Sequence, residues 1–107
     1  MNVIILESNV LGKGDDKLGN TLMGSFLRKL WGNATRPDHI VLYNSGVLLA
    51  TEGSEHLHEM EALQEAGVDI LACSNCLNFF EKELKVGRVS GMEEIVSLMM
   101  EGKVVTL

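Results

Sequence analysis

The chain has 107 residues, of which 46% are hydrophobic and 22% charged, with a single proline. This composition is typical of one folded domain spanning 1–107 and excludes a disordered or fibrous protein. The formal net charge is −6, and no basic stripe of the kind that nucleic acids require is present, so we expect no nucleic-acid partner. No apolar stretch approaches the roughly 20 residues needed to cross a bilayer. Residues 1–7 also lack the features of a signal peptide. We therefore expect a cytoplasmic protein without a membrane partner.

Short β-branched runs alternate with longer helical periods in the first half of the chain, a pattern that predicts parallel βαβ units. Strands are expected over 3–6 and 39–43, and helices over about 17–31 and 54–66. Asp15 or Asp16 is expected to cap the first helix. Its core-facing stripe is predicted to consist of Leu18, Leu22, Phe26 and Leu30, widened by Met23 and Leu27.

The second half of the chain continues the alternation. A strand is expected over 68–72, a helix over about 75–85, a short strand over 88–89 and a final strand over 103–106. Ser90 and Glu93 predict a capping box for a last helix, in which Met99 and Met100 are expected to lie in the core. The apolar loop 44–53 is interpreted as a covering flap or an oligomer contact. The predicted fold is one α/β domain, a mainly parallel sheet with helices on both faces.

The sequence Cys73-Ser74-Asn75-Cys76 follows the third predicted strand. In open parallel sheets, reactive groups gather at the carboxyl ends of the strands. Ser74 or Asn75 is expected to cap the next helix and to place Cys76 in its first turn, where unpaired N–H groups favour a thiolate. A second thiol at this spacing can attack an oxidised or sulfur-laden partner. The pair therefore indicates dithiol redox chemistry or persulfide transfer, with burial of one cysteine in the core as the alternative.

Other motifs add little chemistry. A structural zinc site needs four ligands, and the histidines that could complete one are His39, His56 and His58, the last two of which are expected at the surface. We therefore predict no metal and no cofactor. The turn around Gly12 lacks a phosphate-loop pattern. Polar and glycine residues expected to line the mouth of the cysteine pocket are Ser8, Asn9, Gly12, Asn44, Ser74 and Asn75.

The segment 71–80, LACSNCLNFF, resembles the cysteine turn of the DsrE/DsrF-like superfamily, and more closely the C-terminal domain of YedF-type selenium-metabolism proteins. The resemblance covers nearly the whole chain. It includes VIILES at 3–8 leading into LGKGDDKLG at 11–19, and YNSGV at 43–47 after the second strand. Ser74 and Asn75 depart from it, because relatives often have Gly and Thr at these positions.

This resemblance implies a three-layer α/β/α fold with a five-stranded parallel sheet and assembly into trimers, hexamers or related oligomers. It also implies that Cys73 is the exposed cysteine that carries a persulfide, with Cys76 assisting or resolving. Sulfur donor and acceptor proteins are the implied partners. A SirA/TusA-like protein is one candidate, because such a domain usually begins YedF-type chains.

Three functional hypotheses follow. The first is a sulfur or selenium relay carrier of sulfurtransferase type. The second is a non-catalytic binding or assembly module of a chalcogen-metabolism complex, since no histidine or lysine adjoins the pair. The third, thioredoxin-like exchange, is disfavoured because an aromatic residue before the motif and a proline-bearing strand after it are both missing.

Overall fold

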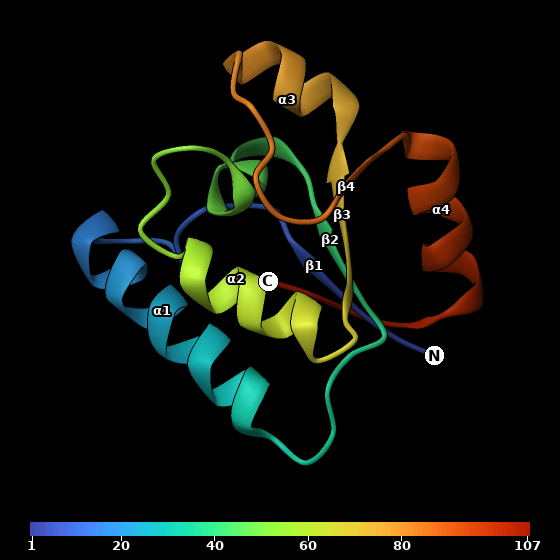
Figure 1. Ribbon diagram of the computed structural model, residues 1–107, viewed down its shortest axis with the longest axis horizontal. Helices are drawn as coiled ribbons and strands as arrows, with labels where there is room; N and C mark the ends of the chain where they lie inside the picture. Colours follow the sequence, from blue (N-terminus) through green and yellow to red (C-terminus); the bar gives the residue numbers. More distant parts are fainter.

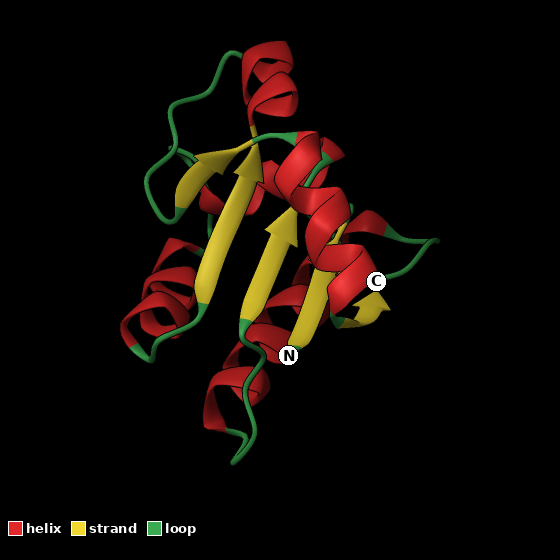
Figure 2. Ribbon diagram, turned by 90° about the vertical axis from the view of Figure 1, so that its right-hand side faces the viewer, coloured by secondary structure: helices red, strands yellow, loops and turns green.

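Five strands form one fully parallel sheet in the computed structural model, which describes residues 1–107. The strand order across the sheet is β4-β3-β2-β1-β5. Figure 2 shows the strand arrows pointing the same way, with the α3 helix beyond their carboxyl ends. The strands are β1 (Asn2–Leu6), β2 (His39–Leu42), β3 (Asp69–Cys73), β4 (Arg88–Ser90) and β5 (Lys103–Thr106).

Helices cover both faces of this sheet, so the predicted three-layer architecture is confirmed (Figure 1). One face packs against α1 and α2, and the other packs against α4 alone. No helix is long and apolar enough to span a membrane. The helices are α1 (Asp16–Gly32), the 3-10 helix η1 (Asn44–Ala50), α2 (Leu57–Glu65), α3 (Ser74–Phe80) and α4 (Met92–Glu101).

The three inner strands are buried on both faces because successive side chains point to opposite sides. Val3, Val41 and Leu71 belong to the core on the α4 side, whereas Ile40 and Ile70 belong to the larger core shared with α1 and α2. This double burial explains why these strands are continuous apolar runs in the sequence.

The predicted core face of α1 is partly right, and its cap is confirmed. Met23 and Leu27 are fully buried as predicted, and Phe26 and Leu30 pack against the core. Asp15 accepts a hydrogen bond from the Leu18 backbone N–H at 2.8 Å, but Leu18 and Leu22 are 57% and 43% exposed. The helix instead turns its small residues inward: a Cβ at Gly19 would lie 2.9 Å from the Val10 Cβ. Close approach at the glycines therefore adds to the buried apolar side chains in packing α1 against the core. The buried residues are Gly19, Met23, Gly24 and Leu27.

The segment interpreted as a flap or oligomer contact is neither, because η1 is part of the core. Val47, Leu49 and Ala50 are fully buried among residues of α1 and α2. A Cβ at Gly46 would lie 2.0 Å from the Leu6 carbonyl oxygen, so only glycine fits where η1 presses on the end of β1.

The helix after the cysteines is shorter than predicted. It ends at Phe80 because Glu81 adopts a left-handed conformation with a φ of 53°. Beyond it, the chain is pinned to η1 by the backbone N–H groups of Lys85 and Val86, which both donate to the Ala50 carbonyl.

The last helix differs from the prediction in its N-cap residue and in the exposure of Met100. Gly91 is the N-cap, and the Ser90 hydroxyl donates to the Glu94 carboxylate at 2.5 Å, so the predicted capping box with Glu93 is wrong. Met100 is 80% exposed rather than in the core. Because α4 is the only helix on this face of the sheet, no further layer covers the outer side of α4.

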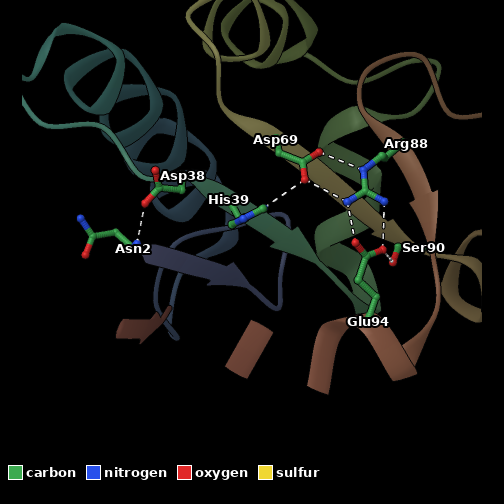
Figure 3. A network of polar contacts seen from close by, with 7 residues as sticks. All are labelled: Asn2, Asp38, His39, Asp69, Arg88, Ser90 and Glu94. Carbon is green, nitrogen blue, oxygen red and sulfur yellow. Dashed lines mark hydrogen bonds and ion pairs between the residues drawn. The ribbon is translucent and has the colours of Figure 1, made fainter. Parts of the chain in front are cut away.

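A charged network ties α4 to the sheet (Figure 3). Arg88 on β4 donates to Asp69 on β3 and to Glu94 on α4, with distances of 2.7 to 2.9 Å. Asp69 also pairs with His39 Nδ1 at 3.0 Å. Arg88 lowers the pKa of Asp69, and its hydrogen bonds, followed by that of Ser90, hold the pKa of Glu94 at about 2.

Candidate functional site

The two cysteines lie at the strand-to-helix turn, as predicted. Cys73 is the last residue of β3, and Cys76 lies in the first turn of α3. Neither forms a disulfide. The turn is at the carboxyl edge of the sheet, next to the end of β2.

The expectation that Cys73 is exposed is wrong. Its side chain is 2% exposed and lies in the core on the α4 side, with Leu71, Ile95 and Leu98. Strand alternation gives residues 71 and 73 the same face of the sheet, and α4 covers that face. Cys73, rather than Ser74 or Asn75, is also the N-cap of α3, and it makes no side-chain capping bond.

Cys76 is the accessible thiol of the pair. It is partly exposed and contacts both hydrophobic cores. Its Sγ accepts a hydrogen bond from the backbone N–H of Asn44 at 3.1 Å. The structure thus places a partly exposed cysteine beside a buried one.

The predicted lowering of the Cys76 pKa is not observed. Desolvation by the surrounding side chains raises this pKa, the neighbouring Cys73 thiol raises it further, and the Asn44 N–H opposes them only in part. The pKa of the Cys76 thiol therefore lies above its ordinary value.

Two residues that the sequence analysis missed lie along the same edge of the sheet. Tyr43 follows β2, is partly buried beside the α4-side core, and has a pKa raised by burial and by the charge of Glu7. Glu7 follows β1 directly. The signal was available, because each polar residue comes immediately after a buried strand and the ends of neighbouring parallel strands meet at one edge.

The residues predicted to line one cysteine pocket do not share a cavity. Ser8 and Gly12 line a cavity of about 360 Å³ beside Leu107. Asn9 lines a different one of about 280 Å³. Neither cavity is lined by a cysteine.

The remaining predicted residues lie nearer to the sulfur atoms. Asn44 contacts Cys76 directly through its backbone N–H. Ser74 and Asn75 lie in the first turn of α3, as Cys76 does. Of the six residues predicted to line the pocket, these three are therefore the ones that lie near the cysteines.

Neither His56 nor His58 lies near the cysteines in a metal-binding arrangement. His56, expected at the surface, is 8% exposed, and its Nε2 lies 2.8 Å from the Asn20 Oδ1. His58 is exposed, as expected. The structure contains no group of three or more His, Cys, Asp or Glu side chains that could hold a metal ion.

The strand order and the helices on both faces define a three-layer α/β/α fold with a five-stranded parallel sheet. Solved structures with this fold superpose on nearly the whole chain. A protein of unknown function, MTH1491 from Methanobacterium thermoautotrophicum, is 24% identical with a TM-score of 0.71, over 99% of this chain and 97% of that one.

Two further structures agree. The ychN protein from E. coli is 15% identical with a TM-score of 0.73, over 99% of this chain and 98% of that one. A conserved protein of unknown function, BT1422 from Bacteroides thetaiotaomicron, is 18% identical with a TM-score of 0.68, over 99% and 94%. No family model and no curated protein sequence matches the chain. At these identities the likeness establishes the fold alone.

Proposed function

We propose that the protein is a sulfur or selenium relay carrier in which Cys76 takes up the chalcogen and Cys73 acts as the resolving thiol. The observation that carries this proposal is one partly exposed cysteine beside one buried cysteine at the carboxyl edge of the sheet. The roles are reversed relative to those implied by the family resemblance, because only Cys76 is accessible to a donor.

In the uptake step, the Cys76 thiolate attacks the terminal sulfur of a persulfide on a donor protein. A bond forms between Cys76 Sγ and that sulfur while the sulfur–sulfur bond of the donor breaks, and the donor leaves as a thiolate. The proton on the transferred sulfur stays with it, so no external oxidant or reductant is needed.

Discharge has two routes. An acceptor thiolate can attack the terminal sulfur and release the Cys76 thiolate, which completes the relay. Alternatively, the Cys73 thiolate attacks Cys76 Sγ, a disulfide forms, and hydrosulfide leaves. In this second route the two cysteines are oxidised, the transferred sulfur is reduced, and a dithiol reductant must restore the pair.

Intact-mass measurement after incubation with a persulfide donor tests the proposal. We expect an adduct of one sulfur atom in Cys73→Ser and none in Cys76→Ser. In the wild type we expect this adduct or, after the second route, the disulfide, whose mass is lower by two hydrogens. The two variants are matched, because each removes one thiol of the same pair. A wild-type mass that stays unchanged would refute the relay function, and an adduct retained in Cys76→Ser would refute the assignment of roles.

A simple alkylation experiment separates the two thiols. Iodoacetamide near neutral pH is expected to label Cys76 first, because it is the accessible sulfur, and to label Cys73 only after denaturation. Peptide mapping gives the order of labelling. Faster labelling of Cys73 in the native protein would contradict this order.

The partners and the compartment belong to the same proposal. Donor and acceptor would be proteins of the reducing cytoplasm, where free thiols persist, and a SirA/TusA-like protein is the candidate that the family resemblance suggests. Self-association of the chain is proposed on the same ground. A mixed disulfide trapped with the Cys73→Ser variant would test for such partners.

The second candidate function is an assembly module, and a surface row on α4 favours it. Met92, Val96 and Met100 recur every four residues on its outer side and are 48%, 46% and 80% exposed. If this row is a contact between copies, Met100→Glu should lower the mass measured by light scattering, whereas Leu18→Glu, at an exposed leucine of α1 on the opposite face of the sheet, should not. Thiols that stay unreactive in the tests above would leave this as the function.

A further inference from the structure

Asn44 has a backbone conformation that few residues adopt. Its φ is 52°, and it shares a positive φ with only one other non-glycine residue, Glu81. Asparagine tolerates this left-handed region better than most residues. Here its Oδ1 also accepts a hydrogen bond from the Ser45 backbone N–H at 2.8 Å.

Hydrogen bonds of the residues before and after Asn44 hold this conformation. The Tyr43 N–H donates to the Leu6 carbonyl at 3.4 Å, and the Gly46 N–H donates to the Tyr43 carbonyl at 3.0 Å. Gly46 lies so close to the Leu6 carbonyl that no side chain fits between them. A strained residue that its surroundings over-determine in this way is typical of a functional site.

The result of this geometry is a donor aimed at a reacting atom. The Asn44 N–H points at Cys76 Sγ at 3.1 Å, and among the influences on the Cys76 pKa it is the one that lowers it. No lysine, arginine or histidine contributes there. The backbone of residue 44 therefore does the work that a neighbouring cation does at other reactive cysteines.

We propose that Asn44 stabilises the negative charge that Cys76 carries as attacking thiolate and again as leaving thiolate, and that its left-handed backbone is what makes this possible. The inference rests on the proposed function for its role in transfer, although the effect on the thiolate can be measured independently. A fixed N–H donor stabilises developing charge without reorganisation, as oxyanion-hole donors do.

Two substitutions separate the backbone conformation from the side chain. Asn44→Gly removes the side chain and keeps the left-handed region readily accessible, whereas Asn44→Val opposes it through a β-branched side chain. Both are made in a Cys73→Ser background, so that Cys76 is the only thiol. The rate of alkylation by iodoacetamide is then followed against pH by intact mass.

We expect Asn44→Gly to keep the pH midpoint of the parent. Asn44→Val should move it upward by about one pH unit, so that alkylation near neutral pH is about tenfold slower. The plateau rates at high pH should be equal, since there the thiolate is fully formed and only accessibility matters. Asn44→Ala, a milder change, replaces Asn44→Val if circular dichroism shows that the valine variant is unfolded.

The outcomes discriminate clearly. Equal midpoints in all variants would overturn the inference, and so would equal shifts in the glycine and valine variants, because the side chain would then be responsible. If the midpoint shifts as expected but the protein takes up no persulfide, the relay function is refuted and the stabilising role of Asn44 remains supported.

Discussion

Replacing Gly46 by alanine tests how tightly η1 is fitted against β1. The new Cβ would lie 2.0 Å from the Leu6 carbonyl oxygen, whereas ordinary contact begins at 3.4 Å. The two backbones must separate by about 1.4 Å to relieve the overlap, which would break the bond from the Tyr43 N–H to the Leu6 carbonyl and pull Asn44 away from Cys76. At about 1 kcal/mol for each of these two bonds, the expected loss of stability is about 2 kcal/mol.

Urea denaturation followed by circular dichroism measures this loss, provided that the slope with denaturant is unchanged. Gly32→Ala is the matched control, because nothing lies within 4 Å of its would-be Cβ and alanine is favoured in a helix by about 0.5–1 kcal/mol. Gly46→Ala should also slow the alkylation of Cys76. A Gly46→Ala protein within about 0.5 kcal/mol of the wild type would refute the reasoning about this contact.

Two further predictions concern the acidic network and the packing of α1. The pKa of Glu94 is about 2 in the folded protein against an ordinary 4.5. The ionised Glu94 therefore contributes fully to the stability of the fold above pH 4.5, and this contribution is lost as the pH falls toward 2. Arg88→Met should lower stability near neutral pH and flatten this acid loss; parallel acid titrations of the two proteins would contradict the assignment. Leu27→Ala should cost about 2–5 kcal/mol because Leu27 is fully buried, whereas Leu18→Ala should cost less than about 0.5 kcal/mol, and chemical denaturation of both variants tests the observed face of α1.

The strands were predictable because their physical signal is local. A strand covered on both faces must be apolar at successive positions, so the runs around Ile4 and Ile70 mark β1 and β3 directly. The last strand matches its expected range of 103–106. The alternation of strands with helices then determined the parallel class of fold.

The orientation of α1 was only partly predictable: Met23 and Leu27 were expected in the core, but the buried face also carries glycines, which have no hydrophobic signal. Gly19 and Gly24 face inward so that the helix can approach Val10 and His56 closely. The exposed Leu18 belongs to a stripe that has the same helical period as a core face. Only the tertiary arrangement decides between the two.

The cysteine turn was predicted in place but not in orientation. Periodicity gives Cys73 the same face as Leu71, yet whether that face is covered at the end of β3 depends on where α4 returns across the sheet. Similarly, the contact of Asn44 with Cys76 joins residues from two different strand ends. No pattern within either segment specifies it.

The position of Cys73 beneath α4 has a consequence for the speed of its chemistry. A reagent or a second thiol can reach this sulfur from outside only when the helix that carries Ile95 and Leu98 moves away, so the opening equilibrium of that helix sets how often an encounter occurs. Hydrogen exchange of the α4 amides and the alkylation of Cys73 by an outside reagent should therefore respond together to any substitution that loosens the helix. Under the proposed relay function, the stability of α4 would also set how often the thiol of another protein meets Cys73.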